Sequence, residues 1–89
     1  MITKTVPIIN KLGLHARPAA LLTKTANLFD CKITVTKGGR CVDAKSILSV
    51  MTLAAKCGEE ITFTADGYNE IPAIESLTAL VQSRFGEDE

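Results

Sequence analysis

The chain has 89 residues, of which 46% are hydrophobic and 22% charged, and this length and composition exclude a multidomain or disordered protein. Ten basic side chains balance ten acidic ones and Trp is absent, so we expect no nucleic-acid partner. No stretch has the length of a membrane span, and the first ten residues lack the apolar core of a secretion signal. We therefore expect a single domain over residues 1–89, located in the cytoplasm, with no membrane span.

The three cysteines, Cys31, Cys41 and Cys57, are far apart and form no C-x-x-C pair. This pattern does not support a disulfide framework. One histidine does not complete a plausible zinc site with thiols so widely spaced. We expect buried, unreactive thiols and neither a metal nor a cofactor.

The first two predicted elements are a strand and a helix. Residues 3–9 are rich in β-branched side chains, and Pro7 among them indicates an edge strand or a bulge. Gly13 then interrupts the strand. Over residues 16–29 the apolar positions recur at intervals of three and four, and Pro18 falls in the first turn, where its missing N–H costs nothing. This spacing predicts a helix over 16–29.

A hairpin and a second helix follow. Residues 32–36 and 40–43 have extended patterns and are separated by a pair of glycines, which predicts two antiparallel strands. Ser46 is a good N-cap residue ahead of a short apolar helix that we expect to end at Gly58.

The last elements are a strand and a helix. Residues 61–65 alternate as a strand, and Pro72 begins a helix that continues to Gly86. We expect the final residues, 87–89, to be a frayed tail. The order β-α-β-β-α-β-α predicts an α+β fold, an open-faced two-layer β-sandwich whose four-stranded antiparallel sheet is covered on one face by three helices. The threonines that alternate with aliphatic residues predict that the other face is wet; they are Thr3, Thr5, Thr34, Thr36, Thr62 and Thr64.

The main candidate functional residue is His15, the only histidine of the chain, which directly precedes the first predicted helix. The free N–H groups and the positive dipole end of a helix N-terminus favour a bound anion. Arg17 can present its guanidinium group to the same anion. A neutral imidazole is a nucleophile as well as a base. His15 and Arg17 are therefore candidates for carrying and holding a phosphoryl group.

The residues alone leave two other interpretations open. In the first, His15 simply caps the helix and Arg17 is a solvated charge of its first turn. In the second, the imidazole acts in general acid–base catalysis, although the sequence shows no second histidine, Cys–His pair or close carboxylate pair to assist it.

Two short motifs carry a resemblance to a known family. The run from Leu12 to Ala20, LGLHARPAA, resembles the active-site signature of HPr, the histidine-containing phosphocarrier of the bacterial phosphoenolpyruvate-dependent sugar phosphotransferase system. The run from Ala44 to Leu48, AKSIL, resembles that family's second signature, which surrounds a regulatory serine. The distance between the motifs, the order of elements and the length also match, so the resemblance covers essentially the whole chain.

The resemblance implies a carrier and not an enzyme. Such a carrier accepts a phosphoryl group from phosphorylated enzyme I on His15 and passes it to the A components (EIIA) of sugar-transport complexes. Arg17 is then the residue that steadies the phosphoryl oxygens. Ser46 becomes the site at which an ATP-dependent HPr kinase/phosphorylase adds a second phosphate, a role compatible with capping the second helix.

The second helix also has a predicted docking role. Too many apolar side chains crowd it for one buried face, and the family uses this helix to dock enzyme I and its acceptors. The candidate exposed patch consists of Ile47, Leu48 and Met51. We expect the chain to act as a monomer.

Some positions differ from the common sugar-branch pattern. Many members of that branch have a polar residue where Leu12 stands and a basic one where Ser49 stands. Residues 9–13 and the acidic end at 85–89 resemble the nitrogen-related paralogue, NPr, which shares the chemistry but serves regulation. The second signature follows the sugar branch. The prediction is an HPr-type phosphocarrier, with NPr as the alternative and a purely regulatory binding module controlled at Ser46 as a third interpretation.

Overall fold

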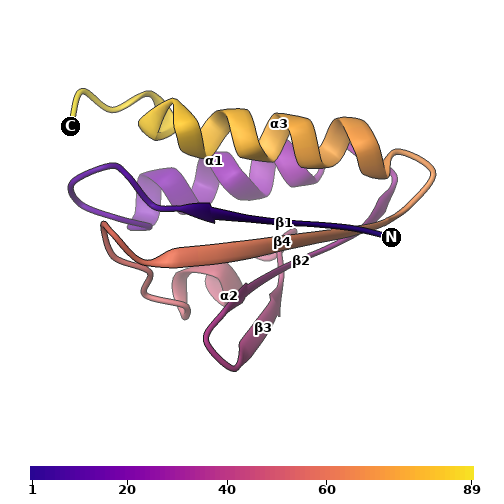
Figure 1. Cartoon of the computed structure of the whole chain (residues 1–89), viewed down its shortest axis with the longest axis horizontal. Helices are drawn as coiled ribbons and strands as arrows, with labels where there is room; N and C mark the ends of the chain where they lie inside the picture. The colour runs from indigo at the N-terminus through magenta and orange to yellow at the C-terminus, as the bar shows by residue number, and fades with distance from the viewer.

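The computed structural model describes residues 1–89. Four strands form one antiparallel sheet in the order β1-β4-β2-β3: β1 (Ile2–Pro7), β2 (Cys31–Lys37), β3 (Arg40–Asp43) and β4 (Glu60–Gly67). Between and after them come α1 (Ala16–Ala26), α2 (Ile47–Met51), α3 (Glu70–Gln82) and a 3₁₀ turn at Arg84–Gly86 (Figure 1). This arrangement confirms the predicted order of elements and the predicted α+β fold.

The two faces of the sheet differ in polarity. The helices α1 and α3 lie side by side over one face, while α2 packs against α1 and β3 (Figure 1). On the other face Thr3 and Thr5 of β1 lie opposite Thr64 and Thr62 of β4, with hydroxyl oxygens 3.4 and 2.8 Å apart. The predicted wet, threonine-rich face is therefore confirmed. As Pro7 predicted, β1 is an edge strand that pairs only with β4.

The hydrophobic core fills the space between the sheet and the helices. The strands contribute alternate side chains and the helices contribute side chains three or four positions apart, as the two periodicities require. Fully buried members include Ile33, Val35, Ile61 and Phe63 from the sheet, Leu22 and Ala26 from α1, and Leu77 and Val81 from α3.

Four predicted helix boundaries were wrong, at least one in each of the three helices. The first helix ends at Ala26 because Asn27 folds its side-chain amide back to donate to the Thr23 carbonyl oxygen. The second ends at Met51, well short of Gly58, because the backbone that follows bonds to the loop around the histidine instead of extending the helix. The third begins at Glu70, two residues before its proline, and ends at Gln82.

The expectation of buried thiols was also wrong. Cys31 is half-buried, whereas Cys41 and Cys57 are exposed, because Cys41 lies on the edge strand β3 and Cys57 in the loop before β4. No three His, Cys, Asp or Glu side chains come together in a way that could hold a metal ion. None of the helices has the length and apolar character needed to traverse a bilayer.

Candidate functional site

The candidate site is centred on His15, the N-cap residue of α1. Its backbone is extended, with φ −83° and ψ −169°, and its side chain makes no capping hydrogen bond. His15 therefore occupies the N-cap position, as one alternative expected, but its imidazole caps no backbone N–H group. The side chain is 37% exposed, so a partner protein can reach it.

The first turn of α1 leaves backbone donors free beside His15. The first intrahelical bond runs from the Ala19 N–H to the His15 carbonyl oxygen, at 2.9 Å, and Pro18 has no N–H. The N–H groups of Ala16 and Arg17 donate to no protein acceptor. Two unpaired donors at the positive end of a helix dipole favour an anion at this point.

The loop before α1 is seated tightly on the segment that follows α2. Gly13 has φ +72°, and a Cβ atom at this position would lie 2.5 Å from the carbonyl oxygen of Ala55. The Leu14 N–H donates to the same oxygen at 2.8 Å. Only glycine allows this approach, so the glycine of the first signature serves to fix where His15 stands.

The C-terminal tail, residues 87–89, packs on this loop. The Glu87 Oε2 atom lies 2.8 Å from His15 Nε2, and Glu87 Oε1 accepts a hydrogen bond from Asn10 Nδ2 at 2.9 Å. The backbone N–H of Lys11 donates to the Glu89 carbonyl oxygen at 2.7 Å. The prediction of a frayed tail was wrong.

A left-handed bend directs the tail to the site. The backbone φ values of Arg84, Phe85 and Gly86 are 57°, 53° and 77°. Residues other than glycine rarely adopt this left-handed conformation. Phe85 is 1% exposed. Burial of its ring stabilises the bend and turns the chain back from the end of α3 toward His15.

Asn10 connects the tail to the loop. It is fully buried, and its Nδ2 atom donates to the Gly13 carbonyl oxygen at 2.8 Å as well as to Glu87. The hydrogen bond from Asn10 is the main cause that lowers the pKa of the Glu87 carboxyl, and the hydrogen bond and charge of His15 and the charge of Arg17 lower it further. Glu87 is therefore ionised at neutral pH.

We expect Asn10→Ala to lower the free energy of unfolding by about 1–3 kcal/mol, because it leaves the buried Gly13 carbonyl oxygen without its donor. Urea unfolding measures this change. Asn27→Ala is the control, since it removes an exposed asparagine that also donates to a backbone carbonyl oxygen. Equal losses in the two variants would contradict the structural role of Asn10.

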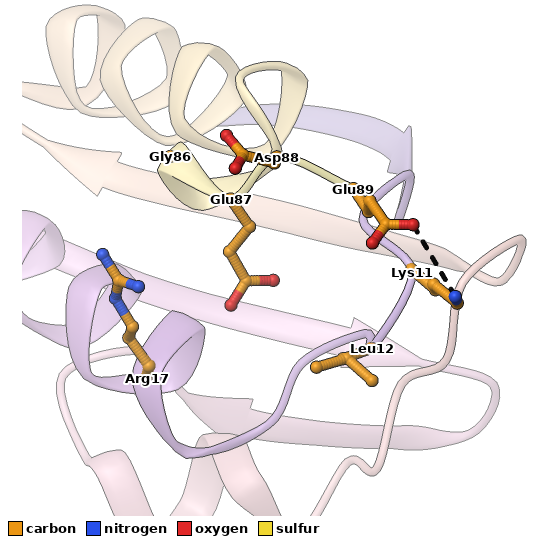
Figure 2. Close-up of a pocket in the computed structure, with 7 residues that line it drawn as sticks. All are labelled: Lys11, Leu12, Arg17, Gly86, Glu87, Asp88 and Glu89. Atoms are coloured by element: carbon orange, nitrogen blue, oxygen red, sulfur yellow. Dashed lines mark ion pairs between the residues drawn. The ribbon is translucent and has the colours of Figure 1, made fainter.

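A shallow pocket of about 400 Å³ lies between the loop and the tail. Lys11, Leu12, Arg17 and residues 86–89 line it (Figure 2). Figure 2 shows Arg17, from α1, and Glu87, from the tail, with their side chains reaching into the space between these two segments. The structure thus places the Arg17 side chain across the pocket from Glu87, which in turn bonds to His15.

Ser46 caps α2, as predicted. Its backbone is extended, with φ −112° and ψ 111°, and its Oγ atom accepts a hydrogen bond from the Ser49 N–H at 3.4 Å. The three candidate docking residues are all exposed on this helix, while Val50 is buried. Ile47, Leu48 and Met51 are 38%, 74% and 40% exposed.

His15 lies at the N-terminal end of α1, whereas Ser46 lies near the C-terminal end of that helix. Asn27, at the end of α1, donates from Nδ2 to the Lys45 carbonyl oxygen, just before α2. The segment after α2 meets the loop before α1 through the bond from Leu14 to Ala55. Because α1 has 11 residues, the two sites are separated by about 16 Å of helix. Ser46 therefore cannot touch a group bound at His15.

Two residues of the site, Asn10 and Glu87, escaped the sequence analysis. Asn10 and Glu87 are 77 positions apart, and His15 and Glu87 are 72 apart. Local periodicity and capping patterns carry no signal for such a contact. The acidic end at 85–89 carried only a family resemblance.

An open-faced sandwich with a partly exposed histidine at the mouth of its first helix defines a class of small phosphocarrier proteins. The chain belongs to the HPr family of the phosphotransferase system, since the family model described as the PTS HPr component phosphorylation site matches residues 2–83.

Individual relatives agree with this assignment. The chain is 48% identical over 89 residues to the phosphocarrier protein HPr of Cupriavidus necator, and the match covers 100% of both chains. A crystal structure of HPr-C-His from Thermoanaerobacter tengcongensis superposes with a TM-score of 0.96 at 44% identity and covers 100% of both chains. A crystal structure described as an HPr dimer from the same organism superposes with a TM-score of 0.79 at 45% identity, covering 98% of this chain and 100% of that chain.

Proposed function

We propose that residues 1–89 act as one phosphocarrier domain of the sugar phosphotransferase system. In the cytoplasm, as a monomer, the carrier accepts a phosphoryl group from phosphorylated enzyme I on His15 and passes it to EIIA components. It completes no reaction by itself, so it is a carrier and not an enzyme. The observation that supports this best is the partly exposed imidazole beside two unpaired backbone N–H groups.

The surroundings of His15 suit a transient phosphohistidine. A phosphoryl group on the ring meets the N–H groups of Ala16 and Arg17 and the positive end of α1. The exposed guanidinium group of Arg17 adds charge-assisted hydrogen bonds to the phosphoryl oxygens. These donors are in place before transfer, which lowers the cost of stabilising the negative charge on the phosphoryl oxygens in the transition state.

The test is to incubate the protein with phosphoenolpyruvate and enzyme I and to assay acid-labile phosphate, the form expected of a phosphoramidate. A carrier retains one such phosphate and loses it when EIIA is added. A hydrolase releases free phosphate, and a binding module takes up none. Either of these two results would contradict the proposed function.

The acceptor to which the protein transfers its phosphoryl group shows whether it belongs to the sugar branch or to the nitrogen-related branch of the phosphotransferase system. Transfer to a sugar-specific EIIA supports the sugar branch. Transfer only to an acceptor of the nitrogen-related branch favours the NPr alternative, to which the acidic end at 85–89 is similar.

We further propose that α2 is the docking surface and that Ser46 regulates it. Ile47, Leu48 and Met51 present exposed apolar area that enzyme I and EIIA can cover. A phosphate on Ser46, added by an HPr kinase/phosphorylase, lies at the edge of this area.

We expect Arg17→Ala to lower the kcat of phosphoryl transfer from enzyme I about tenfold without abolishing it, because Arg17 contacts oxygens and forms no bond to phosphorus. Rapid-quench measurement of acid-labile phosphate gives the rate. Lys24→Ala, at the other end of α1, is the matched control for loss of one positive charge. An Arg17→Ala rate equal to that of the control would make Arg17 only a solvated surface charge.

A further inference from the structure

Glu87 is the only residue whose side chain forms a hydrogen bond with the His15 imidazole. The two atoms, Glu87 Oε2 and His15 Nε2, are 2.8 Å apart. The carboxylate is only 15% exposed, and its other oxygen is held by buried Asn10 at 2.9 Å. Both oxygens of the Glu87 carboxylate are therefore held by hydrogen bonds, one to Asn10 and one to His15. In this the contact differs from an exposed surface ion pair.

The carboxylate determines which ring nitrogen carries the proton. An ionised carboxylate accepts hydrogen bonds and donates none, so Nε2 must be the protonated nitrogen of the neutral ring. Nδ1 then holds the free electron pair, and no protein hydrogen bond occupies it. The carboxylate of a Ser-His-Asp triad fixes the tautomer and orientation of its histidine in the same manner.

We propose that Glu87 is a positioning residue for phosphoryl transfer, which holds the proton of His15 on Nε2 and keeps Nδ1 free to attack phosphorus. This inference rests on the proposed function. In the transfer step the bond between phosphorus and the donor atom of phosphorylated enzyme I breaks, and its electron pair stays with that donor atom. A bond forms between phosphorus and His15 Nδ1, and no proton moves at His15.

The same geometry accounts for the charge that the step creates. The His15 ring becomes a cation when Nδ1 bonds to phosphorus, since Nε2 keeps its proton. The Glu87 carboxylate already lies against Nε2 and is ionised at neutral pH because its pKa is lowered. A fixed opposite charge stabilises a developing charge most where water is partly excluded. On transfer to EIIA the bond between phosphorus and Nδ1 breaks, its electron pair returns to Nδ1, and the ring leaves as a neutral imidazole.

Glu87→Gln tests the proposal because it keeps the size of the side chain but removes one acceptor and the charge. Asn10 and His15 both donate to Glu87, and a glutamine has a single oxygen to offer them. When that oxygen bonds to Asn10, the amide NH₂ group faces Nε2 and favours the opposite tautomer. Glu75→Gln, an exposed residue on α3, is the control for the loss of one negative charge.

Two measurements are made on wild type and both variants. The ¹⁵N spectrum of the unphosphorylated imidazole, at a pH about two units above the ordinary range of histidine, reports which nitrogen is protonated. The rate of acid-labile phosphate uptake from enzyme I reports kcat and KM. We expect Glu87→Gln to raise the Nδ1-protonated population and to lower kcat about tenfold. KM and the melting temperature should stay close to those of Glu75→Gln.

Results that contradict the role of Glu87 can be distinguished from results that contradict the phosphocarrier function. An unchanged spectrum or an unchanged kcat in Glu87→Gln would overturn the role of Glu87 while the phosphocarrier assignment stands. A wild-type protein that takes up no acid-labile phosphate would contradict the proposed function and, with it, any part of Glu87 in transfer.

Discussion

We expect His15→Ala to take up no acid-labile phosphate from enzyme I and phosphoenolpyruvate while the protein remains folded. His15 is the only histidine in the chain, so no other imidazole can form the phosphoramidate. The fold should persist because the side chain makes no capping bond and its only hydrogen bond is to Glu87. Glu87 remains held by Asn10. The measurement is phosphate incorporation followed by acid treatment.

The fold of this variant must be checked alongside its transfer. Far-ultraviolet circular dichroism and a melting curve serve this purpose, and Lys24→Ala provides a folded protein that still accepts phosphate. Acid-labile phosphate retained by His15→Ala would show that another group is the nucleophile. An unfolded His15→Ala would show that the histidine has a structural role that its contacts do not indicate.

The second large effect is expected for Ser46→Asp, which should raise the apparent KM of the carrier for enzyme I ten- to a hundredfold. Ser46 is too far from His15 to disturb the chemistry, since α1 separates them. Its neighbours Ile47 and Leu48 are exposed, so a charge at the edge of this apolar area must be desolvated when a partner covers it. The kcat should change little.

Stability should not explain the effect of Ser46→Asp. Aspartate is as good an N-cap as serine, and it can accept the hydrogen bond that Ser46 accepts from the Ser49 N–H. The concentration dependence of transfer, measured with melting curves for wild type, Ser46→Asp and Ser46→Ala, separates charge from loss of the hydroxyl. Equal KM values for all three would show that Ser46 lies outside the docking surface and only caps α2.

The order of the elements and the place of the histidine follow from local sequence patterns. Strand alternation, helical spacing, the glycine pair of the hairpin and the cap at Ser46 act over a few neighbouring residues, and each was found in the structure. His15 stands directly before α1 for the same reason, because Pro18 marks the first turn of the helix. The resemblance to HPr depended on two such local motifs.

Local patterns were insufficient where two distant segments compete for the same backbone groups. The apolar run after Ser46 predicted a helix up to Gly58, but α2 ends at Met51. Beyond it, the carbonyl oxygen of Ala55 bonds to Leu14 and the N–H of Gly58 bonds to Ile8. Propensity is a weak guide when such tertiary bonds are available.

The side chains that surround the histidine come together only through packing between distant segments of the chain. Nothing near Glu87 in the sequence indicates that it meets His15, because the contact requires the left-handed bend at Arg84–Gly86 and the burial of Phe85 beneath it. The exposure of all three apolar residues of the docking patch likewise depends on how α2 packs against α1. A sequence pattern encodes which faces of an element are apolar, whereas contacts across more than 70 positions exist only once those faces have packed together.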